Sequence, residues 1–260
     1  MPWHDSTCPY DKDQQLGILS LYRDLKKKRR ERSIAKSLKL IQNPKAIREE
    51  RASAIEFFKN LDDPQLAVPA LLKRFDFSLD HGINDTREKE SAMEGILRFK
   101  DAALPFVREH LAKSNRIAWP IKILQRLAEE AQTIEALEAS LDFGEVDFDR
   151  DKVDKNYDVL CYLRDFQLPD QGKKLLRFLS AHDERVRFAV TEVILAQNAQ
   201  EVAKHLEPFL LDESAENTRV RQTVIDAYLE KGWILSLPQI PEGPLAEGVA
   251  VSKDRKLKKA

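Results

Sequence analysis

Apolar positions recur three and four residues apart along most of the chain, which is the period of an amphipathic α-helix. The pattern predicts a succession of helices joined by short polar turns. We expect helices at residues 13–41, 44–61, 64–77, 85–100, 102–113, 115–130, 133–141, 155–167, 171–179, 183–197, 201–211 and 218–231. From residue 44 onward, most of these helices form consecutive pairs. The pairs predict an all-α fold built from antiparallel helical hairpins.

One helical phrase returns with variations. Residues 183–190 read DERVRFAV, and residues 217–224 read NTRVRQTV. Val186 and Val220 are 34 residues apart, which is the length of one repeat of an α-solenoid. We therefore expect a right-handed superhelical stack of about five or six hairpins, each burying its apolar face on its neighbours.

A proline placed just before an apolar triplet forms a second recurring phrase. It occurs at Pro69, Pro105 and Pro208. Proline fits the first turn of a helix, because its missing N–H would have no partner there. We expect each of these phrases to open the second helix of a hairpin.

These phrases resemble HEAT repeats, especially the short bacterial kind that is also found in phycobilisome lyases. The resemblance rests on Arg185–Arg187 with Ala189, on Arg219–Arg221 and on residues 66–72, and the pattern extends over residues 44–235. It implies a curved stack of hairpins that holds a protein partner. It implies no activity, because these motifs specify a fold alone. The second helices of the hairpins are expected to line the concave side.

Three regions are expected along the chain. Residues 1–43 would form an irregular segment and a basic helix that caps the stack, and residues 44–235 would form the repeats. Residues 236–260 contain several prolines and glycines and end in a Lys-rich stretch. That composition predicts a flexible tail.

Composition narrows the class of protein. The chain is 42% hydrophobic and 33% charged with only eight glycines, which suits helices with short turns and argues against a barrel or a dinucleotide-binding fold. No apolar run reaches the roughly 18 residues of a membrane span, and the first residues do not read as a signal peptide. The two cysteines, Cys8 and Cys161, form no CxxC pair. We expect reduced thiols in a cytoplasmic protein that has no membrane contact.

Charge is nearly balanced overall, at −1, but it is unevenly distributed. Nine bases stand against two acids between Arg23 and Lys39, whereas acids dominate residues 142–158. The bases best placed to contact nucleic-acid phosphates are Lys26, Lys27, Lys28, Arg29 and Arg30. They surround the helix instead of forming one stripe, so we favour a solvated face or contact with an acidic protein.

The candidate chemical sites are incomplete. Residues from Asp147 to Asp158 imitate a calcium loop, but Lys152 stands where the loop needs glycine. His4 and Cys8 supply two ligands, whereas a structural zinc ion needs four. The other histidines have no partner at a spacing that suggests a catalytic triad; they are His81, His110, His182 and His205. We predict no enzymatic activity, no metal and no cofactor.

Six residues are candidates for binding or for tying repeats together. Trp119, Arg108 and Lys73 are assigned to a partner-binding surface. Tryptophan is common at interface hot spots, and a position in the core is the favoured alternative for Trp119. Arg187, Arg221 and Asp183 are assigned to contacts between repeats. Because the planar guanidinium suits fixed bidentate pairing, we expect Arg187 and Arg221 to pair with nearby acids, the candidates being Asp183, Asp212 and Glu213.

The expected function is that of a non-catalytic bacterial scaffold, which binds a protein partner along the concave side of the stack. Two alternatives belong to other classes. A nucleic-acid binder or HEAT-like DNA glycosylase would need a basic, aromatic-lined concave face. A lyase or assembly factor resembling the phycobilisome lyases would need a pigment-sized pocket beside an acid or a histidine.

Overall fold

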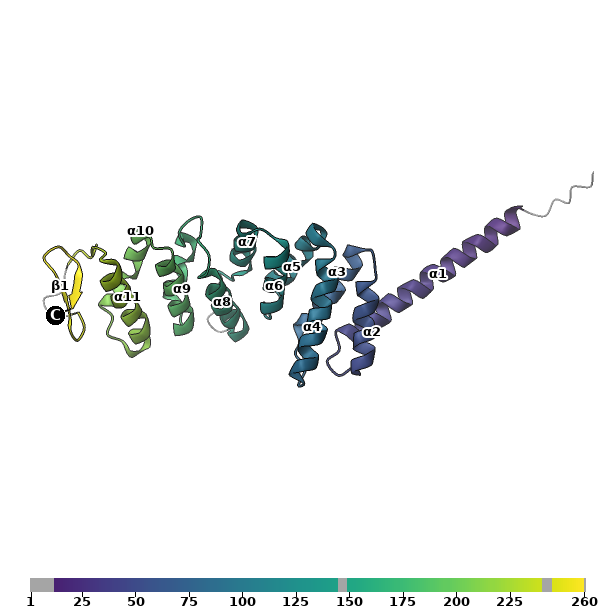
Figure 1. Ribbon diagram of the computed structural model, residues 1–260, viewed down its shortest axis with the longest axis horizontal. Helices are drawn as coiled ribbons and strands as arrows, with labels where there is room; N and C mark the ends of the chain where they lie inside the picture. The colour runs from purple at the N-terminus through teal and green to yellow at the C-terminus, as the bar shows by residue number, and fades with distance from the viewer. Residues whose placement is uncertain (1–11, 145–148, 240–244, 260) are drawn as a thin grey trace, which may run out of the picture. The chain divides into compact units, whose positions relative to one another are not determined.

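The computed structural model describes residues 12–144, 149–239 and 245–259, except for the side chains of residues 12–24. Within these ranges the chain is all-α apart from one short β-hairpin, so the predicted class is confirmed (Figure 1). No helix in these ranges combines the length and the apolar character needed to cross a bilayer. The chain divides into two compact units, Met1–Ala103 and Leu104–Ala260. This division falls inside residues 44–235, which the sequence alone presents as one region.

The first unit is built around α2, which packs against three other helices. Its elements are α1 (Lys12–Ile41), α2 (Arg48–Lys59), α3 (Pro64–Leu72), the 3₁₀ helix η1 (Lys73–Asp76), α4 (Gly82–Leu97) and the 3₁₀ helix η2 (Lys100–Ala103). Helix α2 contacts the end of α1 on one side and α3 and α4 on the other (Figure 1). Ile55, Phe58 and Leu71 are almost fully buried between these helices.

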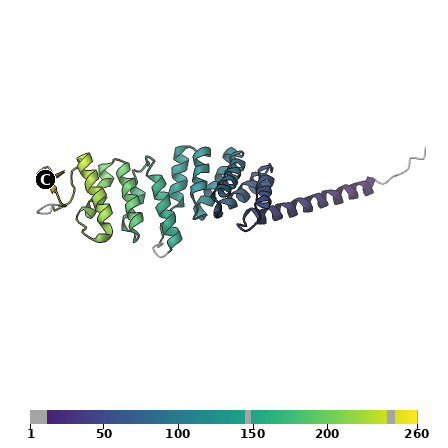
Figure 2. The same cartoon turned by 60° about the horizontal axis from the view of Figure 1, so that its bottom comes forward.

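In the second unit, each helix packs mainly on its neighbours along the chain. Its helices are α5 (Leu104–Lys113), α6 (Ala118–Leu127), α7 (Glu130–Ser140), α8 (Arg150–Leu163), η3 (Lys173–Ser180), α9 (Glu184–Ala196), α10 (Gln200–Ala203), η4 (Lys204–Leu210), η5 (Ala215–Asn217) and α11 (Thr218–Lys231). Helix α9 contacts α8 before it and α11 after it. Figures 1 and 2 show these three helices side by side in chain order.

Local sequence explains where several helices begin and end. Asp63 and Asp183 are the N-cap residues of α3 and α9, and their side chains accept hydrogen bonds from the backbone N–H groups two residues later. Gly232 ends α11 in the left-handed conformation, with φ at 61°. A left-handed C-terminal residue is the usual role of glycine at a helix end.

The segment that imitates a calcium loop is a helix start in its described part. Asp149 is the N-cap of α8, and its side chain accepts a hydrogen bond from the backbone N–H of Lys152. Asp151 and Asp158 lie within α8 itself. Asp147 lies outside the described residues. An α-helix cannot wrap these carboxylates around one ion in the manner of a calcium loop.

Only one of the three proline phrases opens a helix as expected. Pro105 is the second residue of α5, whereas Pro69 lies inside α3 and Pro208 lies inside η4. Helix α3 begins five residues before Pro69, at Pro64, which takes the first-turn position instead. The prediction was therefore wrong for two phrases, because an apolar triplet after proline also fits the middle of a short buried helix.

Hydrogen bonds recur between residues that are 31–37 positions apart in sequence. The Arg98 side chain donates to the carbonyl of Leu61, 37 residues earlier. Gln197 donates to the carbonyl of Phe166, 31 residues earlier, and accepts from the backbone N–H of Leu168. Lys231 donates to Asn198, 33 residues earlier. Each bond joins the end of one helical segment to the next, so the separations bracket the 34-residue spacing of the sequence phrase.

Arg187 joins consecutive segments as expected, but not through an acid. Its guanidinium donates to the carbonyls of Ala181 and His182, both at 2.7 Å, and to the side-chain oxygen of Asn217 at 2.8 Å. The predicted acid pairing is wrong, because the backbone carbonyls just before α9 and the Asn217 side chain are the acceptors within hydrogen-bond distance. Asp183 pairs with Arg185 at 2.8 Å instead.

Arg221 uses carbonyl acceptors in the same way. It donates to the carbonyl of Leu210 at 3.1 Å and to the carbonyl of Leu245 in the C-terminal segment. Of the predicted acids, Glu213 lies 3.8 Å away and is largely exposed. An exposed pair at that distance adds little stability, so the carbonyl bonds carry the contact.

The described part of the C-terminal tail is folded, which corrects the expectation of a flexible segment at residues 236–260. Strands β1 (Val249–Val251) and β2 (Leu257–Lys259) pair in an antiparallel hairpin, and β2 contacts α11. Leu245, Val249 and Leu257 are buried. Strands of three residues give too short an alternation to be recognised in a Lys-rich sequence.

A buried carboxylate anchors this terminal segment. Glu207 is 2% exposed and accepts hydrogen bonds from the Tyr228 hydroxyl at 3.0 Å and from the backbone N–H of Ser236 at 2.9 Å. Burial and the nearby Glu207 carboxylate raise the pKa of Tyr228, which keeps this hydroxyl a donor. Glu207 thus connects η4, α11 and the chain that leads to the hairpin.

Replacing Glu207 with alanine should destabilise the second unit by about 1–3 kcal/mol, because the buried Tyr228 hydroxyl and the backbone N–H of Ser236 lose their acceptor. Urea unfolding followed by circular dichroism measures the change. Glu230→Ala, at an exposed position of α11, is the matched control and should change stability by less than about 0.5 kcal/mol. Equal stabilities for the two variants would contradict the anchoring role.

Candidate partner-binding groove

The first unit contains a buried ionic cluster, defined by Arg51, Arg74, Asp85, Glu88 and Lys89. Glu88 lies at its centre. Arg51 binds both oxygens of Glu88, with Nε–Oε2 and Nη2–Oε1 distances of 2.7 and 2.9 Å. Arg74 donates from Nε to the same Oε2 at 2.8 Å. One carboxylate of α4 is thus held by guanidinium groups from α2 and η1.

Asp85 forms the second half of the ionic cluster, one turn earlier in α4. Its carboxylate accepts from Arg74 Nη2 and from Lys89 Nζ, each at 2.7 Å. The backbone N–H of Leu79 also donates to Asp85, at 3.0 Å. Arg74 is fully buried and joins the two carboxylates. The cluster therefore also fixes the loop between η1 and α4.

The ionic cluster is satisfied by hydrogen bonds beyond its ion pairs. Arg51 also donates to the carbonyl of Ala46 at 2.6 Å, and Arg74 donates to the carbonyl of Phe77 at 3.3 Å. A buried charge is tolerated when its remaining hydrogen-bonding groups find partners. The five side chains consequently act as a rigid joint between α2, η1 and α4.

A groove runs between α2 and α4 beside this joint. Its volume is about 140 Å³. Its lining comes from both helices and comprises Arg48, Ala52, Ile55, Glu56, Asn84, Arg87, Glu88 and Ser91. Glu88 belongs to both the ionic cluster and the groove lining, so the buried cluster sets the spacing of the groove walls.

Two exposed isoleucines lie at the starts of the same two helices. Ile47 is the N-cap residue of α2, Ile83 is the second residue of α4, and each side chain is 63% exposed. They are 36 residues apart in sequence, and each lies at the start of its helix. Figure 1 shows the first turns of α2 and α4 at the same end of the first unit.

Two arginines accompany the isoleucines. Arg48 and Arg87 line the groove, are exposed, and form no ion pair with another described residue. Guanidinium groups beside large apolar side chains suit a partner segment that carries both apolar and acidic residues. We call the groove together with Ile47 and Ile83 the α2–α4 groove.

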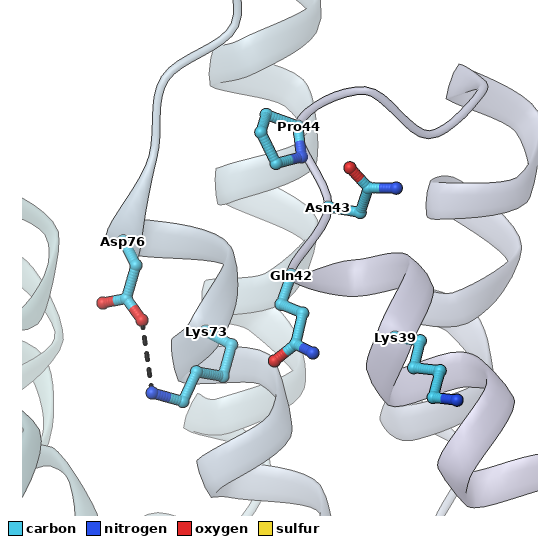
Figure 3. A pocket seen from close by; sticks show the side chains of 6 residues that line it. All are labelled: Lys39, Gln42, Asn43, Pro44, Lys73 and Asp76. Atoms are coloured by element: carbon cyan, nitrogen blue, oxygen red, sulfur yellow. Dashed lines mark hydrogen bonds and ion pairs between the residues drawn. The ribbon is translucent and has the colours of Figure 1, made fainter.

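Lys73, predicted to bind a partner, lies elsewhere in the first unit. It lines an open pocket of about 530 Å³ with Lys39, Gln42, Asn43, Pro44 and Asp76 (Figure 3). Figure 3 shows the Lys73 amine directed at Asp76, with a 3.4 Å contact, while the Lys39 amine lies on the far side of Gln42. The two amines do not converge on one point, so this pocket is not built to hold one anion.

The other two predicted binding residues belong to the second unit. Arg108 in α5 is half-buried, and its Nη1 lies 3.5 Å from Glu135 in α7. Trp119 in α6 is half-buried, and the Lys122 amine lies 4.6 Å from its ring centre. Lys73 belongs to the other unit, so these three residues do not define one site within either unit.

A cavity of about 210 Å³ lies in the second unit between the end of α7, α8, η3 and α9. Asp142 and Asp183 line it, but each is engaged: Asp142 accepts from the backbone N–H of Gly144 at 3.0 Å, and Asp183 caps α9. Arg177 donates to the carbonyl of Phe143 and lies over its ring. The volume of this cavity is below the roughly 300–1,000 Å³ that is typical of small-molecule binding sites.

Among the described residues, no three or more histidines, cysteines or acids are grouped to hold a metal ion. His4 and Cys8 lie outside those residues, and Cys161 is a half-buried free thiol in α8. No protein-family model, no curated protein and no solved structure matches this chain. The site must therefore be judged from its own geometry.

Sequence reasoning did not find the α2–α4 groove. The sequence does contain a signal for this groove. Ile47 and Ile83 stand at the starts of α2 and α4, 36 residues apart, and an arginine follows Ile47 by one residue and Ile83 by four. Helical periodicity assigns such residues to the core by default. Their position in the first turn, before the packed part of the helix, is what leaves them exposed.

Replacing Glu88 with alanine should destabilise the first unit by about 3–5 kcal/mol, because Arg51 and Arg74 would remain buried without their carboxylate. Hydrogen-exchange mass spectrometry should show faster exchange in α2 and α4 and little change in α9. The control, Glu90→Ala, lies on the exposed side of α4 and should leave exchange unchanged. Unchanged exchange in both variants would show that the cluster does not hold these helices together.

Stability of the first unit should fall in acid through Asp85. Burial alone would raise the pKa of Asp85, but hydrogen bonds from Lys89 and Arg74 outweigh it and lower the pKa below its ordinary 3.8. The unfolded chain then takes up this proton at a higher pH than the folded chain does. The contribution of Asp85 is therefore present above pH 3.8 and is lost as the pH falls through the lowered folded value.

Urea unfolding at several acidic pH values tests this dependence. Asp85→Asn should be less stable than the unmodified chain above pH 3.8, and the difference should shrink below that value. Asp101→Asn, at an exposed position of η2, should keep the original pH dependence. A constant difference between Asp85→Asn and the unmodified chain would contradict the assignment.

Proposed function

We propose that this protein is a HEAT-like α-solenoid scaffold that binds a protein partner and catalyses no reaction. Support for the architecture comes from the repeated phrase at residues 183–190 and 217–224 and from hydrogen bonds between residues 31–37 apart. Proteins built this way contact only sequential neighbours and use their long surface for binding. A bacterial cytoplasmic setting belongs to the same proposal.

The observation that carries the binding proposal is the exposed pair Ile47 and Ile83 beside the α2–α4 groove. Ile47 and Ile83 are large apolar residues, each 63% exposed at the start of its helix, and would serve as two anchors for a partner. Exposed apolar residues grouped beside a groove are typical of interaction sites, whereas single scattered ones are not. The expectation from the sequence placed the binding surface on second helices, and this groove lies between first helices.

The chemistry of the groove indicates the kind of partner. Its volume of about 140 Å³ accommodates one or two side chains, and it is too small for a pigment or another cofactor of ordinary size. Arg48 and Arg87 would pair with carboxylates, while Ile47 and Ile83 would contact apolar residues. The proposed partner segment therefore alternates apolar and acidic side chains.

Affinity purification from the native host with quantitative mass spectrometry tests this function. A partner recovered with the unmodified chain should be reduced about tenfold or more with I47S/I83S, because two anchors each contribute more than about 1 kcal/mol. The control is L211S/I234S, which removes two other exposed apolar side chains in the second unit. Circular dichroism should show that both variants stay folded.

The outcomes separate the site from the general function. Loss of the partner with I47S/I83S and not with the control supports the α2–α4 groove. Equal recovery with both variants would reject the groove as the binding site. Recovery of no protein partner with the unmodified chain would reject the scaffold function itself.

A further inference from the structure

The basic part of α1 is exposed on all sides. Every residue from Leu25 to Ser33 is exposed, and Leu25 itself is 57% exposed although it is apolar. Helix α1 packs against α2 and α3, and Ile41 at its end is fully buried. The segment from 25 to 33 is therefore held in place only by the continuity of the helix.

The charge of this exposed segment is strongly positive. Between Lys26 and Ser33 there are six bases and one acid, Glu31, and no apolar residue. Successive residues of an α-helix turn by about 100°, so six bases within seven positions are distributed around the whole circumference. None of these bases forms an ion pair with another described residue.

The distribution of these bases around the helix indicates which kind of polyanion the segment can bind. A membrane surface needs an apolar face on the opposite side of the helix, which residues 26–33 do not have. A flat acidic protein surface contacts one side of a helix and leaves the other bases unused. The major groove of a nucleic-acid duplex has phosphates on both walls, so bases on several sides of one helix can contact it together.

We propose that residues 26–33 of α1 bind duplex DNA by lying in its major groove. An α-helix with its side chains is about 10–12 Å across, and the major groove of B-form DNA is about 12 Å wide. The corresponding groove of an RNA duplex is narrow and deep. Arg29, Arg30 and Arg32 can each pair with a phosphate through two hydrogen bonds.

The structure changes the interpretation of the basic residues between Lys26 and Arg32. The sequence alone favours a solvated face, because the bases surround the helix instead of forming one stripe. In the structure no side of residues 25–33 faces the protein, so the spread no longer argues against nucleic acid. Lys36 and Lys39, both exposed, add positive charge between this segment and the packed end of α1.

Fluorescence anisotropy of a labelled DNA duplex with the full-length protein, at a series of salt concentrations, tests the proposal. Six phosphate contacts predict that log K falls with log salt with a slope of about −5, at about 0.9 per contact. The variant K27Q/K28Q/R30Q/R32Q keeps good helix formers and should reduce that slope by about 3 to 4. The matched control K253Q/K256Q/K258Q/K259Q removes the same charge from the C-terminal hairpin and should bind like the unmodified chain.

The competing partners are measured in the same assay. An RNA duplex, vesicles containing phosphatidylserine, and polyglutamate should each bind more weakly than the DNA duplex. Tighter binding to any of them, no binding to DNA, or equal weakening in the two charge variants would overturn the proposal. I47S/I83S should bind DNA normally, so failure of the α2–α4 groove and failure of the DNA site can be told apart.

Discussion

The arrangement of the first unit depends on one buried carboxylate. Glu88 of α4 accepts hydrogen bonds from Arg51 of α2 and from Arg74 of η1. Burying two guanidinium groups is costly unless a carboxylate and further acceptors are present, so the three elements are stable together and not separately. This constraint fixes the distance between α2 and α4, and with it the groove and the spacing of Ile47 and Ile83.

In the second unit, too, one arginine connects neighbouring helices by hydrogen bonds, but with different partners. Arg51 donates backward to the carbonyl that precedes its own helix and forward to Glu88 of the next segment. Arg187 does the same with the carbonyl of His182 and with Asn217. An acid in one place and an amide in the other satisfy the same geometry. Different acceptors can thus hold neighbouring helices together in the two units of this chain.

The sequence predicted the fold class and most helix positions, because helical periodicity is a local signal. The bounds of α11 were predicted as residues 218–231 and are confirmed. The acceptors of Arg187 were not predictable, since backbone carbonyls belong to every residue and leave no sequence signature. The exposure of Ile83 was equally hidden, because the apolar pattern does not show which turn of a helix extends beyond its neighbours.

The β-hairpin on α11 has a consequence for assembly. A stack of similar helices presents an end face on which another copy could continue the series, and such head-to-tail contacts produce filaments when they do not close. Here β2 packs on α11, and the carbonyl of Leu245 accepts from Arg221, the residue that corresponds to Arg187. The hairpin therefore covers part of α11 that would otherwise be open to a second copy of the chain.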